Sequence, residues 1–226
     1  MGMGKADRGE ARLARGETVS HSQRRRQGGG QAGSEGGGER SLYFRRWLAH
    51  PLRMASILPA SEDLCRRVAA AAIAEGNGRI VELGAGTGSV TRALLEAGVA
   101  ASRLIAVELD PELASHLRAA VPEVEVIEGD AYALPQLLPR DWLGRSTIVC
   151  GLPITFLPRA RQMALVEAMS QVLGPGLPFI QYTYRWTSPV PHADLGLAAR
   201  RVGLSLASLP PATIWAFRRK ETTPQA

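Results

Sequence analysis

The stretch from Arg79 to Thr91, RIVELGAGTGSVT, constrains the fold more than any other part of the chain. It begins as a short apolar run, turns through glycines in the spacing G-x-G-x-G, and continues into a helical pattern. Glycines in such a turn let a ligand approach the backbone, and the N–H groups at the start of the helix point towards that ligand. The stretch therefore predicts a strand, a turn and a helix that together bind a nucleotide.

Acidic residues at the ends of successive apolar runs narrow the choice of ligand. Glu82 stands just before the first glycine of the turn, where a carboxylate suits a cationic ligand and not a pyrophosphate. Glu108 ends the next run, about twenty residues past the turn, where an acid accepts hydrogen bonds from both ribose hydroxyls of an adenosine. Asp130 follows the third run, where its carboxylate can accept a hydrogen bond from an adenine amino group. Ser89 stands where a dinucleotide fingerprint has glycine.

These features together resemble the class I S-adenosylmethionine-dependent methyltransferases. The resemblance rests on the E-x-G-x-G-x-G turn, on Glu108 and on the Gly-Asp130-Ala131 segment, and it covers residues 79–219. It implies an α/β, Rossmann-like fold with a seven-stranded, mostly parallel sheet whose seventh strand is antiparallel. It also implies S-adenosylmethionine as the cofactor, and no metal. The alternative is a Rossmann-like domain that binds NAD or another nucleoside.

The resemblance implies that residues of the glycine turn and of the strand ends hold the cofactor. The turn would offer bare backbone, and the acids would bind polar groups. The implied cofactor-binding residues are Glu82, Gly84, Ala85, Gly86, Gly88, Glu108, Leu109, Asp130, Ala131, Gly151 and Leu152.

Apolar runs and helical patterns alternate from Arg79 onwards, which predicts a parallel sheet with helices on both faces. Ser61 has the character of a helix N-cap with acids in the following turn, and this helix should end near Gly76. The last two strands have no clear helix between them, so we expect an edge hairpin. Strands are expected at 79–83, 103–108, 124–128, 146–151, 178–184, 204–208 and 212–218. Further helices are expected at 89–97, 111–120, 158–173 and 192–202.

Charge and composition limit the partners and the compartment. The chain of 226 residues carries a net charge of +6, and its pI of about 10.0 favours acidic partners, either nucleic acid or an anionic membrane surface. No apolar run is long enough to span a membrane as a helix, and the N-terminus lacks the apolar core of a signal peptide. Cys65 and Cys150 have the character of buried thiols in a reducing compartment. We therefore expect a cytoplasmic protein.

The N-terminal part of the chain divides into two segments ahead of the methyltransferase domain at 61–226. Residues 1–40 are rich in Gly and Arg without a periodic apolar pattern, which predicts a disordered basic tail. This tail is either solvated or a weak electrostatic tether to acidic lipids or RNA. Residues 41–60 predict an amphipathic helix and a substrate-covering segment, and the helix either lies in a membrane interface or packs on the domain. The expected membrane-binding residues are Tyr43, Phe44, Arg45, Arg46, Trp47 and Arg53.

The carboxyl ends of the fourth and fifth strands should hold the acceptor. Methyltransferases that act on exocyclic base amines carry Asn or Asp after the fourth strand, followed by Pro-Pro or Leu-Pro and an aromatic residue. Here that polar position is Gly151, in GLPITF, which counts against the rRNA adenine dimethyltransferases. The fifth strand ends in QYTYR, and strand alternation places Tyr182 and Tyr184 on one face.

This region resembles the bacterial phospholipid N-methyltransferases. Their chains show an arginine-aromatic N-terminal helix, a Leu-Pro-Ala/Ser segment, Gly-Asp-Ala-Tyr, Gly-Leu-Pro and Gln-aromatic-Thr-Tyr, which this chain matches over residues 42–219. The resemblance implies methylation of phosphatidylethanolamine towards phosphatidylcholine by a peripheral enzyme on the inner face of the cell membrane. The expected partners are an anionic membrane surface and the phospholipid, with no specific nucleic acid, and the protein is expected to be a monomer.

The residues at the end of the fifth strand suit this chemistry. A primary ammonium must lose a proton before it can attack a methyl group, and phenols or an imidazole can orient the amine or accept that proton. An arginine can hold the lipid phosphate. Two alternatives stay open, an RNA or DNA N-methyltransferase and a non-catalytic lipid- or RNA-binding relative. The expected catalytic residues are Tyr182, Tyr184, Arg185 and His192.

Overall fold

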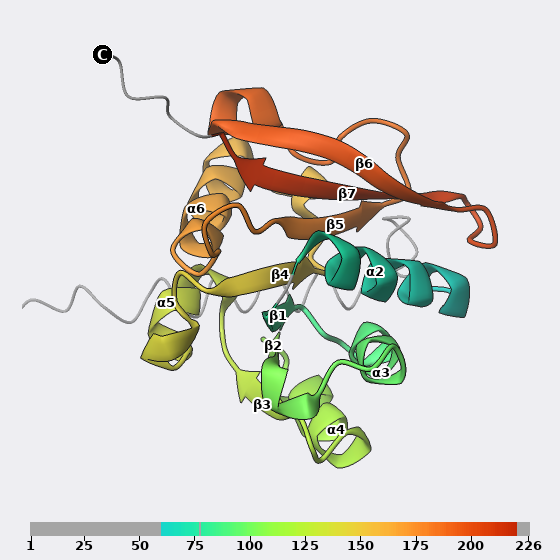
Figure 1. Ribbon diagram of the computed structural model, residues 1–226, viewed down its shortest axis with the longest axis vertical. Coiled ribbons are helices and arrows are strands. Elements are labelled where there is room, and N and C mark those ends of the chain that lie inside the picture. Colours follow the sequence, from blue (N-terminus) through green and yellow to red (C-terminus); the bar gives the residue numbers. More distant parts are fainter. Residues whose placement is uncertain (1–59, 77, 221–226) are drawn as a thin grey trace, which may run out of the picture.

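The computed structural model describes residues 60–76 and 78–220, which form a single sheet flanked by helices (Figure 1). The predictions for the tail and for the amphipathic helix fall on residues 1–59 and lie outside the described residues. The strands are β1 (Arg79–Leu83), β2 (Leu104–Glu108), β3 (Glu125–Glu128), β4 (Ser146–Cys150), β5 (Phe179–Thr183), β6 (Leu197–Ser205) and β7 (Ala212–Arg219). The helices are α2 (Glu62–Glu75), α3 (Ser89–Glu96), α4 (Pro111–Ala120), α5 (Leu134–Leu137) and α6 (Arg159–Ser170).

The seven strands have the order β3-β2-β1-β4-β5-β7-β6. Strands β1 to β5 pair in parallel, whereas β7 is antiparallel to both β5 and β6. This confirms the expected fold class, including the antiparallel seventh strand and the edge hairpin. The chain reverses its direction of travel across the sheet between β3 and β4, so the crevice for a ligand lies beyond the carboxyl ends of β1 and β4.

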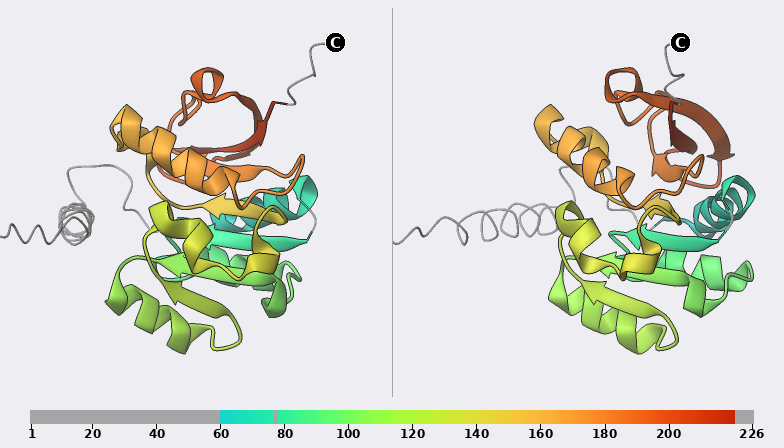
Figure 2. Two further views of the ribbon diagram at one scale, coloured as in Figure 1. Left: turned by 90° about the vertical axis from the view of Figure 1, so that its left-hand side faces the viewer. Right: turned by 60° about the vertical axis from the view of Figure 1, so that its left-hand side comes forward.

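Helices cover both faces of the sheet and divide the core into two layers (Figure 2). Helices α2 and α3 cover one face, where side chains such as Leu64 and Leu94 are fully buried. Helices α5 and α6 cover the other face, over Leu165 and Phe179. Cys65 and Cys150 are buried free thiols, as expected.

The helix boundaries follow from local chemistry. The Ser61 hydroxyl accepts a hydrogen bond from the Leu64 N–H at 3.2 Å, and acids occupy the first turn of α2, where they favour the positive end of the helix dipole. Helix α2 ends at Gly76, so the predicted helix start and end are both confirmed. Asp110 caps α4 in the same way and accepts hydrogen bonds from the N–H groups of Glu112 and Leu113.

The prediction of a helix at 192–202 is wrong. This segment forms only a short 3-10 turn, η6 (His192–Leu195), and then the long strand β6. Gly196, at φ 64°, ends the turn, and the residues beyond it pair with β7 from Leu197 to Ser205. Helix propensity is weak, and pairing along a whole edge strand outweighs it. The strand expected at 204–208 is therefore the end of a longer one.

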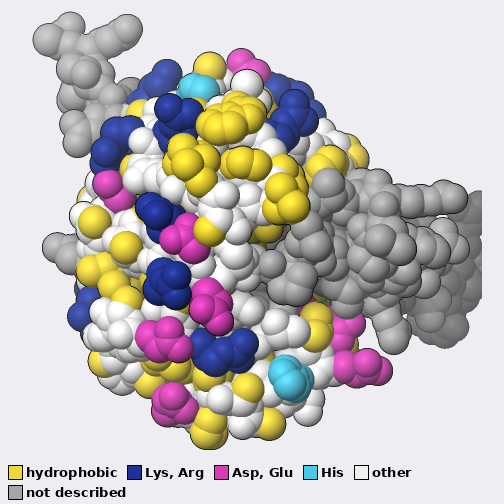
Figure 3. Space-filling model, turned by 90° about the vertical axis from the view of Figure 1, so that its right-hand side faces the viewer, with side chains coloured by type: hydrophobic (Ala, Val, Ile, Leu, Met, Phe, Trp, Pro, Cys, Tyr) yellow, Lys and Arg dark blue, Asp and Glu magenta, His cyan; other side chains and the backbone are white. Residues whose placement is uncertain are grey.

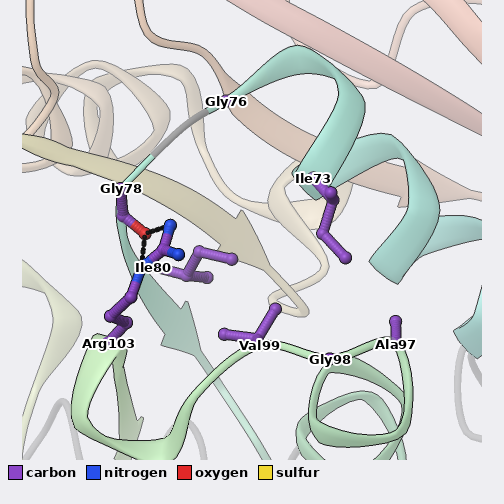
Figure 4. Close-up of a pocket in the computed structure, with 8 residues that line it drawn as sticks. All are labelled: Ile73, Gly76, Gly78, Ile80, Ala97, Gly98, Val99 and Arg103. Carbon is purple, nitrogen blue, oxygen red and sulfur yellow. Dashed lines mark hydrogen bonds between the residues drawn. The ribbon is translucent and has the colours of Figure 1, made fainter.

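A shallow pocket lies at the amino end of β1, between the ends of α2 and α3 (Figure 4). Arg103 crosses its mouth and donates to the Gly78 carbonyl oxygen from Nε at 2.9 Å and from Nη2 at 2.5 Å. The pocket is at the opposite edge of the sheet from the glycine turn and contains no acid. Its lining residues are Ile73, Gly76, Gly78, Ile80, Ala97, Gly98, Val99 and Arg103.

Candidate active site

The glycine turn after β1 has the backbone conformation that its sequence requires. Gly84, Gly86 and Gly88 have φ values of 68°, 56° and 80°, in the left-handed region that favours glycine. A Cβ at Gly84 would lie 2.6 Å from Cδ2 of Leu152, and one at Gly88 would lie 2.3 Å from Cδ1 of Leu117. A Cβ at Gly86 would meet nothing within 4 Å, so this glycine faces open space where a ligand can approach the backbone.

Glu108 is buried at the end of β2 and connects two parts of the site. Its Oε2 accepts a hydrogen bond from the Gly86 N–H at 2.8 Å, and its Oε1 accepts one from the Asp110 N–H at 3.0 Å. The carboxylate thus holds the glycine turn in place. Each oxygen keeps a second lone pair, which can accept a hydrogen bond from a ligand hydroxyl.

Glu82 is a second buried acid, on the face of the sheet covered by α2 and α3. The Thr91 hydroxyl donates a hydrogen bond to its Oε2 at 2.6 Å. Burial raises the pKa of the Glu82 carboxyl to about 7, and the negative charge of Glu108 raises it further, against the Thr91 hydrogen bond. Among the described residues, no basic side chain forms a salt bridge with either acid. Two buried carboxylates without a basic partner fit a cationic ligand such as S-adenosylmethionine.

Asp130 lies at the end of β3, on the turn beside Glu108. Its Oδ1 accepts a hydrogen bond from the Tyr132 N–H at 3.0 Å and caps the short turn η3 (Ala131–Ala133). The Gly129 N–H donates to the Glu108 carbonyl oxygen at 2.9 Å, which fixes this turn against the end of β2. The structure therefore brings the predicted acids to the carboxyl ends of three adjacent strands, β1, β2 and β3.

Gly151 follows β4 and lies directly against the glycine turn. Its N–H donates to the Leu83 carbonyl oxygen at 2.8 Å. A Cβ at this position would lie 2.8 Å from the carbonyl oxygen of Gly84 and 3.2 Å from that of Leu83. The same Cβ would be 3.6 Å from the hydroxyl oxygen of Tyr182. A side chain has no room here unless the backbone shifts.

Tyr182 and Tyr184 both pack on the face covered by α2 and α3, which confirms that they share a face. Burial raises the pKa of Tyr182 well above its usual range, and the neighbouring Tyr184 raises it further. Burial also raises the pKa of Tyr184. Both phenols therefore stay protonated at neutral pH, and of the two roles expected for them, the structure favours orienting an amine over accepting its proton.

The structure does not bring His192 together with Tyr182 and Tyr184, and its catalytic role stays a prediction. Its ring lies 6.4 Å from that of Phe217, which pairs with Phe179 at the start of β5 on the face covered by α6. Tyr182 and Tyr184 lie at the other end of β5 and on the other face. The loop after β5 places His192 near Phe217, which neither spacing nor residue type revealed.

Arg185 is exposed at the end of β5, and its backbone is fixed by β7. Its carbonyl oxygen accepts a hydrogen bond from the Thr213 hydroxyl at 2.6 Å. Among the described residues, its guanidinium forms no salt bridge. The expected role in holding a phosphate stays a prediction.

Sequence reasoning missed Gln181 and Thr91. Gln181 is buried in β5, and its Nε2 donates to the Leu152 carbonyl oxygen and to that of Tyr182, both at 3.0 Å. It therefore fixes the Gly-Leu-Pro segment beside the glycine turn. The signal for Gln181 was a polar residue in an apolar strand, and for Thr91 it was a hydroxyl on the buried face of α3.

The described part of the chain contains neither a candidate metal site nor a candidate membrane-spanning helix. Residues 60–76 and 78–220 contain no group of three or more His, Cys, Asp or Glu side chains that could hold a metal ion. In these same ranges, no helix is both long enough and apolar enough to cross a bilayer.

Comparisons with known proteins agree with this geometry. Residues 80–176 match the family model described as a methyltransferase domain. The ornithine lipid N-methyltransferase of Singulisphaera acidiphila is 33% identical over 146 residues, which cover 63% of this chain and 76% of that protein. The ribosomal RNA small subunit methyltransferase A of Chlamydia felis is 28% identical over 91 residues, which cover 40% of this chain but only 31% of that protein.

A solved structure shows the same fold. The magnesium protoporphyrin IX methyltransferase of Synechocystis, with S-adenosylmethionine bound, aligns with a TM-score of 0.58. The alignment covers 84% of this chain and 100% of that chain, at 14% sequence identity. At this level of identity the likeness concerns the fold alone.

Proposed function

The chain belongs to the class I S-adenosylmethionine-dependent methyltransferases, and we propose that it methylates the head-group amine of a membrane lipid. S-adenosylmethionine is its cofactor. The acceptor we propose is phosphatidylethanolamine, with its methylated intermediates, towards phosphatidylcholine. The named function of the Singulisphaera relative favours ornithine lipid as a second candidate, and both lipids present a primary amine at the membrane surface.

The acceptor side of the site carries the proposal. A methyltransferase acting on a base amine holds that amine with a side-chain carbonyl after β4, whereas Gly151 has no space for a side chain. Instead, the hydroxyl of Tyr182 lies beside this position, and Tyr184 is on the same face. Phenol faces and oxygens suit an aliphatic amine that gains methyl groups and positive charge.

The chemistry divides between the cofactor and the chain. When bound, S-adenosylmethionine supplies a methyl group that is already electrophilic because it is attached to a sulfonium. The ammonium gives its proton to water, the uncharged nitrogen then bonds to the methyl carbon, and S-adenosylhomocysteine leaves with the electrons of the broken C–S bond. The residues of the chain hold the cofactor and align the amine for this step. The Tyr182 oxygen can accept a hydrogen bond from an N–H of the uncharged amine and leave the nitrogen lone pair free. The aromatic faces then stabilise the quaternary cation that repeated methylation produces.

A single assay tests the function. The full chain is given labelled S-adenosylmethionine, and liposomes of phosphatidylethanolamine, liposomes with ornithine lipid and purified rRNA are offered in parallel. We expect label in the lipid fraction. Label in ornithine lipid alone would move the acceptor to the second candidate, and label confined to rRNA would replace the proposal by an RNA methyltransferase.

Glu108 should be required for cofactor affinity. In Glu108→Gln, an amide donor replaces one of two acceptor oxygens that fix the glycine turn and face the ligand. A hydrogen bond to a charged group contributes about 1.5–3 kcal/mol, so calorimetry should show binding weakened by about tenfold or more. Glu112→Gln, at an exposed acid in the first turn of α4, is the matched control. Equal affinity in the two variants would remove Glu108 from the ribose-binding role.

Glu82 should make cofactor binding depend on pH. The pKa of its carboxyl is about 7 without ligand, and a cation bound beside it lowers that pKa because opposite charge favours the ionised form. Binding should therefore release a proton, and affinity should rise as the pH increases from about 6 to about 8. Calorimetry in buffers of different ionisation enthalpy measures that proton directly. The same pH dependence in Glu82→Gln would assign the titration to the cofactor instead.

The same pKa shift affects stability without the cofactor. The folded pKa of about 7 exceeds the ordinary value of 4.5, so the folded protein holds this proton more tightly than the unfolded chain does. The stabilisation from that proton is fully present below the ordinary pKa and is lost as the pH rises through the folded one. Relative to Glu82→Gln, the ligand-free melting temperature should therefore fall over this window.

A further inference from the structure

The turn of the β6–β7 hairpin exposes two leucines. Leu206 is 70% exposed and Leu209 is 85% exposed. Single exposed leucines are common on protein surfaces, whereas neighbouring ones on one projecting turn form a patch. In Figure 1 this turn projects at the right-hand end of the hairpin, near the start of α2. The turn is therefore a convex, apolar point on the surface.

The hairpin turn lies at the same end of the strands as the candidate acceptor site, near the carboxyl end of β5. Strand β7 runs antiparallel to β5 and pairs Thr213 with Thr183, so the start of β7 lies beside the end of β5. The Thr213 hydroxyl donates to the Arg185 carbonyl oxygen at 2.6 Å, which joins the hairpin to the loop after β5. Tyr182 and Tyr184 belong to this same end of β5.

Buried serines fix the turn so that its leucines point outwards. The Ser205 hydroxyl donates to Oδ2 of Asp63 at 2.6 Å, and the hydroxyl oxygens of Ser208 and Ser61 are 2.8 Å apart. Both hairpin serines are buried against the first turn of α2. Asp63 is itself held by Arg67 at 2.8 Å. The turn is thus anchored through its polar side chains, and its apolar ones remain free.

Two further apolar side chains are exposed in the segments that follow β4 and β5, at the carboxyl ends of the strands. Trp186, in the loop after β5, is 60% exposed, and Phe156, in the loop after β4, is 44% exposed. The Thr155 hydroxyl donates to the Pro189 carbonyl oxygen at 3.2 Å and so joins these loops. Hydrophobic side chains gather in the upper part of this face, flanked by Lys and Arg (Figure 3). We call Phe156, Trp186, Leu206 and Leu209 the apolar rim.

We propose that the apolar rim inserts into the interface of an anionic phospholipid bilayer, and that the hairpin turn inserts most deeply. The carboxyl ends of β4 and β5, where the candidate acceptor site lies, then face the bilayer. This inference rests on the proposed function, because a lipid amine tethered by its acyl chains reaches Tyr182 only if these strand ends meet the bilayer. Exposed aliphatic and indole side chains beside a basic one suit such an interface. Arg185, next to Trp186, supplies the basic side chain.

The course of the chain supports the same orientation. The described structure begins at Ala60, next to Ser61, whose hydroxyl contacts Ser208 of the hairpin turn. The residues predicted from sequence to bind a membrane, at 42–54, precede this point in the chain. A convex apolar turn can enter a fluid bilayer directly. To dock a helix this surface would have to form a groove, and to receive the turn a second protein would have to supply one.

Substituting the hairpin leucines tests the inference. We compare the full chain with the double variant Leu206→Ser/Leu209→Ser in sedimentation with vesicles of phosphatidylethanolamine and phosphatidylglycerol. Partition should fall by at least about tenfold in the double variant, because it loses two apolar side chains from the interface. Ile73→Ser, which replaces a 42% exposed side chain near the opposite edge, is the matched control and should bind as the parent does. Equal partition of all three proteins would overturn the inference.

A labelled variant separates the possible occupants of the rim. An environment-sensitive dye on Leu209→Cys should shift to the blue when these vesicles are added, since Cys65 and Cys150 are buried and react poorly. A dye that is already shielded without vesicles would assign the rim to another part of this chain. A rim-dependent change of mass in light scattering would assign it to a second copy. Either result would overturn insertion into a bilayer.

The outcome for the rim is distinguishable from the outcome for the proposed function. Turnover is measured on vesicles and on short-chain phosphatidylethanolamine dissolved as monomers. The double variant should lower the ratio of the first rate to the second by about tenfold or more, in line with the lost partition. An unchanged ratio would overturn the role of the rim while lipid methylation stands. Rim-dependent vesicle binding without methylation of either lipid form would overturn the proposed function alone.

Discussion

Replacing Tyr182 by phenylalanine should lower turnover on lipid by at least tenfold while leaving the affinity for S-adenosylmethionine unchanged. The hydroxyl oxygen of Tyr182 lies 3.6 Å from the position that a Cβ at Gly151 would take, and Gly151 itself lies against the glycine turn. Loss of the hydrogen bond that orients the amine misplaces the attacking nitrogen, and a misplacement of about 1 Å can lower the rate by about 10²-fold. Radiolabel transfer to phosphatidylethanolamine vesicles gives the rate, and calorimetry gives the cofactor affinity.

The alanine variants separate hydrogen bonding from stacking. If the phenol oxygen orients the amine, Tyr182→Phe and Tyr182→Ala should be similarly slow. If the ring only stabilises the methylated cation, phenylalanine should substitute well and alanine should not. Tyr184 lies on the same face and is partly buried like Tyr182, so Tyr184→Phe serves as the matched comparison. Full activity in both alanine variants would remove the acceptor from this corner.

The positions of the glycine turn, the acids and the two tyrosines were predictable because their signals are local. The glycines that need a positive φ, the acids at strand ends and the alternating tyrosines each depend on a few neighbouring residues. The structure confirms that these residues meet at the carboxyl ends of the strands, and that Glu82 and Glu108 are buried beside the glycine turn. Local sequence was therefore sufficient to place these residues, whereas their roles towards the cofactor and the acceptor stay predictions.

The remaining features depend on contacts between distant segments. The residues of β6 were expected to form a helix, but they pair along their length with β7. His192 was grouped with the tyrosines because it follows them closely, yet its loop carries it to the ring of Phe217 on the other face. The apolar rim likewise combines loops after β4 and β5 with a hairpin turn, and hydrogen bonds join these loops only in the folded chain.

Gly151 was recognised from sequence as a departure, but its physical reason is visible only in the fold. In the sequence it was a missing side-chain carbonyl after β4. In the structure, β4 lies so close to β1 that a Cβ would enter the space of the carbonyl oxygens of Leu83 and Gly84. The glycine turn can therefore keep its shape only if residue 151 has no side chain. The same residue thus affects both the binding of the cofactor and the kind of acceptor that the site can hold.

Gly151→Ala should therefore weaken the binding of the cofactor and also slow the reaction. Its Cβ would lie 2.8 Å from the Gly84 carbonyl oxygen, and a backbone atom cannot move aside as a flexible side chain can, so the glycine turn must shift. Overpacking of this kind costs about 1–3 kcal/mol, which predicts a loss of cofactor affinity of about 5-fold to 150-fold by calorimetry. Gly203→Ala is the matched control, because its Cβ would meet the side chain of Ile214, nearest at Cδ1 at 3.0 Å, and no backbone atom of the glycine turn. The control should lose a little thermal stability and keep its cofactor affinity. If Gly151→Ala bound S-adenosylmethionine as tightly as the parent, the glycine turn would tolerate a side chain at residue 151. The lack of space there would then no longer argue against a base-amine acceptor.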